Sequence, residues 1–267
     1  MTSAQKRPPL VFSHANGFPA PCYAKMFSAL AADFDIRYLP RLAHNPAYPV
    51  TDSWPELTQE LIDFIEQGPH PVIGVGHSLG GFLSFLAAAR RPDLFSALVL
   101  LDAPVIEPYR ASALHMTKLL GFIDRVTPAR ATRDRRRTWA TAAEAIAHFR
   151  SRKLFRRFDP DCLADYVRYG MVSTPEGLAL WFDPAIESRI YCTIPHRAHR
   201  LLPELTVPAG FIGGRQSVEL RLFGLGGMRG RLRMRPIDGG HLFPFEHPLE
   251  TATALREMVQ ALRAPGD

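Results

Sequence analysis

The feature that most constrains the fold is the run from Val72 to Gly81, in which an apolar segment leads straight into a helical pattern. The apolar part is typical of a strand covered on both faces in a parallel sheet. The turn between the two parts has the pattern G-x-S-x-G. So sharp a turn strains the central residue and excludes side chains two positions away, which Gly76 and Gly80 satisfy. Ser78 is therefore expected above the sheet edge, at a helix N-terminus.

Apolar runs and helical patterns alternate along much of the chain, which predicts a doubly wound parallel sheet with helices on both faces. A helix is predicted from Ser53, because Glu56 three residues later would complete a capping box. Another is predicted from Pro248, with five residues pointing inward: Leu249, Ala252, Leu255, Met258 and Val259. Six strands are predicted, at residues 10–12, 34–39, 71–75, 97–101, 209–212 and 232–236.

The alternation of strands and helices breaks between residues 103 and 202, where we see helical patterns and no convincing strand. We predict that residues 1–104 and 201–267 form the α/β core and that residues 105–200 form a helical cap inserted over the edge that carries Ser78. Residues 125–157 hold eleven basic and two acidic side chains and carry a charge of +9, whereas the rest of the chain sums to −3. Without a nucleic-acid fold motif or interleaved aromatic residues, this stretch indicates a solvated helical face rather than a nucleic-acid site.

The composition of the chain indicates the cellular compartment in which the protein works. Three cysteines without a CxxC pair argue against a disulfide framework or a zinc site and favour a reducing compartment. Residues 1–9 lack the apolar region of a secretory leader, and no apolar run reaches the length of a membrane span. We therefore expect a cytoplasmic protein with no membrane partner.

Four segments together resemble the α/β-hydrolase superfamily: Ser13–Pro19, the turn at Ser78, Leu100–Pro104 and Asp238–Pro244. The resemblance implies the α/β-hydrolase fold, with Ser78 as nucleophile. We expect the N-terminal hairpin usual in that fold to be missing, because only about nine residues precede the first predicted strand. We therefore expect a mostly parallel sheet of about six strands, flanked by helices.

A serine nucleophile needs a neighbouring base, and histidine has a suitable pKa. The resemblance implies His241 for this role, since it follows the last predicted strand in the chain order serine, acid, histidine. His77 is expected to be packed. The spacing of His196 and His199 would allow a metal ligand pair, but no carboxylate or cysteine pattern supports one. We expect no metal and no cofactor.

The acid that orients the histidine is less defined. Its usual loop, after the next-to-last strand, has Gln216 and Ser217 where the carboxylate is expected, and Glu219 lies two residues late. Asp102 directly follows the strand after the Ser78 helix, and parallel strand ends share one crevice. We favour Asp102 and keep Glu219 as the alternative.

An acyl-transfer site also needs two amide donors for the developing oxyanion. We assign the Leu79 amide and, from the loop after the first strand, the Asn16 amide, with Gly17 as the fallback. Substrate selectivity is expected in the cap and its seam with the core. The candidate lining residues are Phe18, Phe82, Trp139 and Trp181, each of which also suits a packed core, as do Phe149, Phe155 and Phe182.

These features predict a carboxylic ester hydrolase that acts on a small-molecule substrate through an acyl-enzyme on Ser78. The same residues would serve a carbon–carbon bond hydrolase, a lactonase, a thioesterase or a perhydrolase, and the motifs do not separate these reactions. A receptor that binds a small molecule without turnover is an alternative of another class. The sequence does not indicate the oligomeric state.

Overall fold

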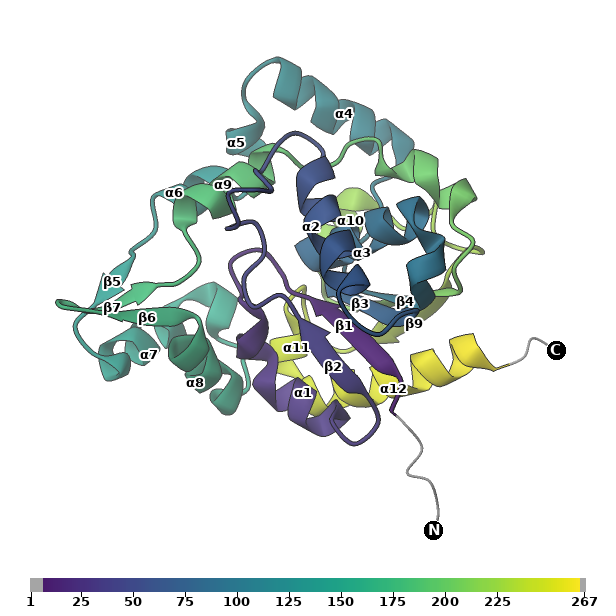
Figure 1. The fold of residues 1–267 in the computed structure, drawn as a ribbon. Helices are drawn as coiled ribbons and strands as arrows, with labels where there is room; N and C mark the ends of the chain where they lie inside the picture. Colours follow the sequence, from purple (N-terminus) through teal and green to yellow (C-terminus); the bar gives the residue numbers. More distant parts are fainter. Residues whose placement is uncertain (1–6, 265–267) are drawn as a thin grey trace, which may run out of the picture.

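The core is a six-stranded sheet in which every neighbouring pair of strands is parallel (Figure 1). This computed structural model describes residues 7–264. The strand order is β2-β1-β3-β4-β8-β9. All six strands predicted from the sequence are confirmed, with ends within two residues of those expected: β1 Pro9–Ser13, β2 Asp35–Tyr38, β3 Val72–His77, β4 Phe95–Leu101, β8 Ala209–Gly214 and β9 Arg233–Ile237.

Helices cover both faces of this sheet, which explains the continuously apolar strands. On β1, Leu10 and Phe12 face one hydrophobic cluster and Val11 faces the other. Helices α1 (Ala24–Leu30) and α12 (Pro248–Arg263) pack together on the first side, and α2 (Pro55–Glu66) and α3 (Leu79–Arg90) on the second. Shorter helices link the strands: η1 Ala20–Tyr23, η2 Pro92–Leu94, α10 Val218–Phe223 and α11 Phe243–Glu246.

The chain leaves the sheet after β4 and returns to it at β8. The insertion is largely helical, but it also contains a three-stranded antiparallel sheet in the order β5-β7-β6, which the sequence analysis did not find. These strands have only two to four residues, too few for a period-two pattern to show in the sequence. The elements of the insertion are α4 Pro108–Leu119, α5 Ile123–Val126, α6 Ala129–Arg133, β5 Thr138–Trp139, α7 Ala142–Ser151, η3 Lys153–Phe155, α8 Pro160–Tyr169, β6 Met171–Thr174, β7 Gly177–Leu180, α9 Pro184–Cys192 and η4 Ala198–Glu204.

Two local expectations are also wrong. Ser53 does not cap a helix, because Ser53 and Trp54 both have left-handed backbone angles (φ 65° and 61°) and α2 begins only at Pro55. Leu249 does not point inward, since it lies in the first turn of α12 and is 56% exposed.

Three further features concern membrane spans, the cysteines and the basic stretch of residues 125–157. Within residues 7–264, no helix is both long and apolar enough to cross a membrane. All three cysteines are unpaired, and Cys22 and Cys162 are buried. The basic stretch is largely exposed, and part of its charge is met by carboxylates, as in the pairs Arg133–Asp124 and Arg136–Glu144.

Helix α12 offers a paired test of which face stabilises the fold. Leu255 is fully buried in the cluster shared with α1, so Leu255→Ala should lower the free energy of unfolding by about 2–5 kcal/mol. Leu249→Ala, on the exposed face of the same helix, should change it by less than about 0.5 kcal/mol. Urea denaturation followed by circular dichroism measures both, and equal effects would contradict this packing.

Candidate active site

Ser78 stands in the sharp turn between β3 and α3 with a backbone φ of 52°, in the left-handed region. The glycines around it are required by close contacts. A Cβ added at Gly76 would lie 2.2 Å from the carbonyl oxygen of Gly80, and one added at Gly80 would lie 2.0 Å from that of Ser13. Larger residues would therefore force the helix away from the strand. The strained turn places Ser78 at the first turn of α3.

A continuous line of hydrogen bonds joins Ser78, His241 and Asp102. The Oγ of Ser78 lies 2.9 Å from Nε2 of His241, and Nδ1 of the same ring lies 2.7 Å from Oδ2 of Asp102. Asp102 directly follows β4 and His241 follows β9, so both come from carboxyl ends of strands in the same sheet. The structure thus brings together the serine, the histidine and the favoured acid of the sequence analysis.

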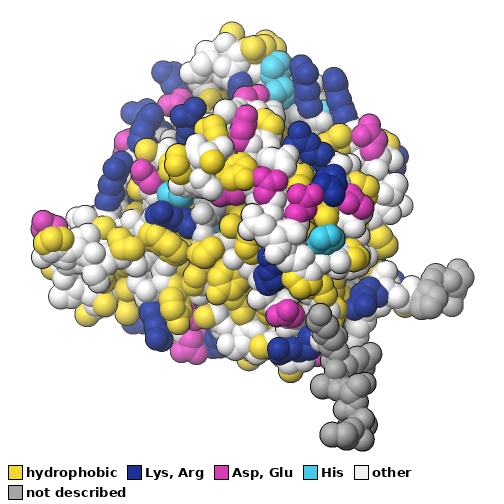
Figure 2. Space-filling view, viewed as in Figure 1, with side chains coloured by type: hydrophobic (Ala, Val, Ile, Leu, Met, Phe, Trp, Pro, Cys, Tyr) yellow, Lys and Arg dark blue, Asp and Glu magenta, His cyan; other side chains and the backbone are white. Residues whose placement is uncertain are grey.

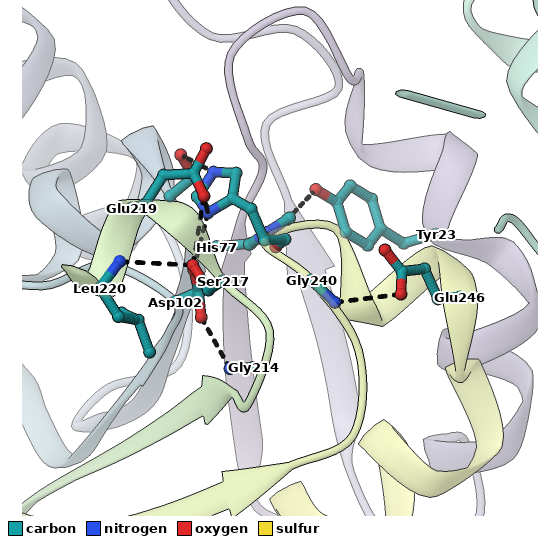
Figure 3. Close-up of polar contacts among 11 residues, drawn as sticks. Tyr23, His77, Asp102, Gly214, Ser217, Glu219, Leu220, Gly240 and Glu246 are labelled. Carbon is teal, nitrogen blue, oxygen red and sulfur yellow. Dashed lines mark hydrogen bonds and ion pairs between the residues drawn. The ribbon is translucent and has the colours of Figure 1, made fainter. Parts of the chain in front are cut away.

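Asp102 is fully buried and is held by several donors (Figure 3). The amide of Gly214 donates to its Oδ1 at 2.8 Å, and the hydroxyl of Ser217 donates to its Oδ2 at 2.5 Å. Gly214 is the last residue of β8 and Ser217 lies in the loop that follows, where the acid was first sought in the sequence. Ser217 therefore contributes a hydrogen bond to Asp102 from the position where a carboxylate was expected.

Glu219, the alternative acid, also lies beside the imidazole but makes no hydrogen bond to it. Its Oε2 is 3.9 Å from Nδ1 of His241, and its side chain is 36% exposed. Together with Asp102 and His241 it forms a cluster whose metal-ligating atoms lie within 4.8 Å of one another. Because both oxygens of Asp102 already accept hydrogen bonds, the arrangement suits a hydrogen-bonded relay better than a metal site.

Burial and the neighbouring carboxylates act on the pKa of His241 in opposite directions. Burial disfavours the charged imidazolium, whereas the hydrogen bond and the charge of Asp102 favour it; the balance raises the pKa of His241 above its usual value. An imidazole with a raised pKa is a stronger base. This electrostatic setting suits proton transfer from the Ser78 hydroxyl.

A second chain of hydrogen bonds, which the sequence analysis missed, connects the loop after β1 to the backbone of His241. The Tyr23 hydroxyl lies 3.2 Å from the Ala15 amide and 2.7 Å from Nδ1 of His77, and Nε2 of His77 lies 2.9 Å from the carbonyl oxygen of His241. The amide at one end can only donate and the carbonyl at the other can only accept. The direction is therefore fixed: Ala15 donates to Tyr23, Tyr23 to His77, and His77 to His241.

This second chain stays uncharged during any proton transfer at His241. Burial, and then the nearby charge of His241, lower the pKa of His77 to about 3. His77 is packed, as expected, and it helps to fix the His241 backbone. Tyr23 left no local signal, because its partner lies 54 residues further along the chain.

The loop after β1 lies against the start of α3, where the amide of Gly80 donates to the carbonyl of His14 at 3.1 Å. Within the described part of the chain, the amides of Leu79 and Asn16 donate to no acceptor. The side chain of Asn16 is anchored to the insertion through the carbonyl of Glu187 at 3.0 Å. Two backbone amides are thus without an acceptor: that of Leu79, directly after Ser78, and that of Asn16, in the loop after β1.

The candidate lining residues are largely packing residues. The ring of Phe18 packs at a tilt against Tyr166 of the insertion and Phe245 of the core, with ring centroids 5.2 Å and 5.1 Å away. Trp139 is only 2% exposed and packs on Phe149, so it offers no surface to a substrate in this structure. Phe82 is buried one turn after Ser78, and Trp181 is half-buried beneath the Arg41 guanidinium. A lining role for Phe18, Phe82 and Trp181 stays a prediction.

Among curated proteins, similarity is partial. A type I acyl-CoA thioesterase of Penicillium brevicompactum is 30% identical over 171 residues, which are 57% of this chain and 37% of that protein. A monoglyceride lipase of Rattus norvegicus is 45% identical over 56 residues, 20% of this chain and 18% of the lipase. The chain therefore spans less than two fifths of the curated relatives that it matches.

Solved structures match over nearly the whole chain. E-2-(acetamidomethylene)succinate hydrolase superimposes with a TM-score of 0.72 at 19% identity, covering 96% of this chain and 92% of that one. A thioesterase domain from the curacin biosynthetic pathway gives 0.71 at 15% identity, covering 94% and 92%. At these identities the likeness establishes the fold. The model of the alpha/beta hydrolase family matches residues 10–254, and the chain belongs to that family.

Proposed function

We propose that this hydrolase cleaves carboxylic esters through an acyl-enzyme on Ser78. The observation that carries the proposal is the unbroken series of hydrogen bonds from the Ser78 hydroxyl through His241 to the buried Asp102. A serine hydroxyl next to a histidine that is itself held by a carboxylate is the arrangement that makes serine nucleophilic at neutral pH.

In the first step, Nε2 of His241 takes the hydroxyl proton as Ser78 Oγ attacks the ester carbonyl. Asp102 stabilises the imidazolium that forms and keeps Nδ1 protonated. The amides of Leu79 and Asn16 donate to the oxyanion, and loss of one such donor typically costs about 3 kcal/mol. The imidazolium then protonates the departing alkoxide, which leaves an acyl-serine. Water, deprotonated by His241, releases the acid in the mirror-image step.

Thioester hydrolysis is the second candidate, because the same attack expels a thiolate. It is favoured by the resemblance to the Penicillium acyl-CoA thioesterase and by the exposed arginines of residues 125–157, which would attract a phosphate-bearing thiol carrier. Lactone or carbon–carbon bond cleavage, perhydrolysis and ligand binding without turnover are alternatives that the same residues allow.

Substrate panels separate these reactions. We expect the wild-type protein to hydrolyse short nitrophenyl esters, and Ser78→Ala to lose at least about 10³-fold in kcat because it removes the nucleophile. Acyl-coenzyme A substrates of matched chain length, followed by release of free thiol, distinguish thioester from ester preference. A wild-type protein inactive on both series would contradict the proposal and favour the receptor.

The identity of the acid can be tested with two isosteric substitutions. Asp102→Asn should lower kcat by about 10³-fold or more, because it removes the anion that stabilises the imidazolium. Glu219→Gln should stay within about fivefold of wild type, since a partly exposed charge 3.9 Å away contributes at most about 1 kcal/mol. The reverse pattern in steady-state kinetics would assign the role to Glu219.

The pH dependence follows from the raised pKa of His241. The imidazole must be neutral to accept a proton, so kcat/KM should rise with pH and reach half its plateau above about pH 6.5, the usual histidine pKa. Asp102→Asn removes the hydrogen bond and the charge that raise this pKa and should shift the midpoint to lower pH. A midpoint that does not move would mean that the titrating group is not His241.

A further inference from the structure

Helix α4 lies at the outer edge of the insertion (Figure 1), and most of its large apolar side chains are exposed. Four large apolar side chains are at least half exposed: Tyr109 (65%), Met116 (50%), Leu119 (66%) and Leu120 (64%). Their spacing of seven, three and one residues places them on one side of a helix. Only Ala111 of this helix is buried. Leu114 is partly buried against the core, so the outward side of the helix carries more large apolar side chains than the inward side.

Arg110 and Lys118 of this helix are both paired with carboxylates, and the guanidinium of Arg110 also lies over the ring of Tyr109, 5.2 Å from its centroid. Arg110 pairs with Glu107 at 3.4 Å, and Lys118, whose side chain is only 11% exposed, pairs with Asp52 and donates to the carbonyl of Ile194 at 2.6 Å. The exposed part of the helix around Met116, Leu119 and Leu120 consequently has no exposed charged side chain of α4. The exposed residues between positions 108 and 121 are Pro108, Tyr109, Ser112, Ala113, Met116, Leu119, Leu120 and Gly121.

The apolar surface continues onto two neighbouring helices. Val126 of α5 is exposed, as are Val218 and Leu222 of α10, which lies beside the start of α4 through a hydrogen bond from Arg110 to the carbonyl of Arg221. Seven of the ten exposed large apolar residues in the described chain belong to this one region. We call the surface formed by Tyr109, Met116, Leu119, Leu120 and Val126 the α4 face. Contiguous apolar surfaces of this kind mark interaction sites.

The margin of the α4 face is basic. Arg125 and Arg221 are exposed beside Val126 and Leu222, whereas the nearby acids Glu107 and Asp52 are already paired with Arg110 and Lys118. In Figure 2 the top of the molecule, where α4 lies, is mostly white and yellow, with dark blue side chains on both sides. A helical face of exposed apolar side chains with arginines at its margin is the pattern of helices that lie in a bilayer interface.

Contrary to the expectation from the sequence of no membrane partner, we propose that the α4 face docks this protein onto a lipid bilayer that carries anionic headgroups. The apolar side chains would enter the headgroup boundary and the marginal arginines would contact lipid phosphates. A second copy of the chain fits less well, because a twofold interface would bring the same basic margins together. Docking would also bring the membrane near the active site. Helix α10, which carries the exposed Val218 and Leu222, also carries Glu219, whose Oε2 lies 3.9 Å from Nδ1 of His241.

Vesicle sedimentation tests the proposal without any turnover, so its outcome is independent of the function proposed for Ser78. The probes are vesicles of phosphatidylcholine alone and vesicles with one third phosphatidylglycerol. The wild type should bind the anionic vesicles at least tenfold more tightly than the neutral ones. The double variant Leu119→Glu/Leu120→Glu should lose at least tenfold of that binding. The variant Arg125→Glu should weaken binding to anionic vesicles only.

Leu154→Glu is the matched control, because Leu154 is 55% exposed among basic residues of the same insertion but lies outside the α4 face. It should bind as the wild type does, which separates the apolar face from general basic charge. Circular dichroism checks that the variants are folded. Wild-type protein that ignores both vesicle types, or equal losses in Leu154→Glu and the double variant, would overturn the proposal. So would a wild-type dimer that the double variant converts to a monomer in light scattering.

Discussion

The hydrogen bond between the His241 ring and the buried carboxylate of Asp102 is the interaction on which the site depends. A fully buried carboxylate is costly unless donors surround it. Here the donors are Gly214, Ser217 and His241, which come from the end of β8 and from the loops after β8 and β9. The carboxylate therefore joins three strand ends at once, and the same contacts that satisfy its charge also set the orientation of the imidazole towards Ser78.

The geometry around Ser78 rests on close backbone approach as well as on side chains. Gly80 packs against Ser13 too tightly for any side chain, which brings the loop holding Asn16 beside the start of α3. Tyr23 and His77 then tie that loop to the backbone of His241. The proposed nucleophile, base and oxyanion donors are thus fixed relative to one another before substrate arrives, which is how preorganised sites lower a barrier.

The sequence alone predicted the features whose signals are local. The central strands β3 and β4 are continuous apolar runs, and the turn at Ser78 is constrained by its own glycines. Asp102 was favoured because the usual acid loop has Ser217 instead, and the structure shows these two residues hydrogen-bonded to each other. Features that depend on distant contacts did not show, among them the Tyr23–His77 chain and the short antiparallel strands of the insertion. The outward face of α4 was equally hidden, because leucines in a helical pattern normally indicate burial.

The central claim is that His241 activates Ser78, and the most direct measurement is covalent labelling by a fluorophosphonate probe followed by peptide mass spectrometry. The probe phosphonylates a serine only when its hydroxyl is activated by a neighbouring base. We predict a single adduct on the peptide that contains Ser78, and a labelling rate at least about 10³-fold lower in His241→Ala. An adduct on another residue, or labelling of Ser78 that is undiminished in His241→Ala, would contradict the account.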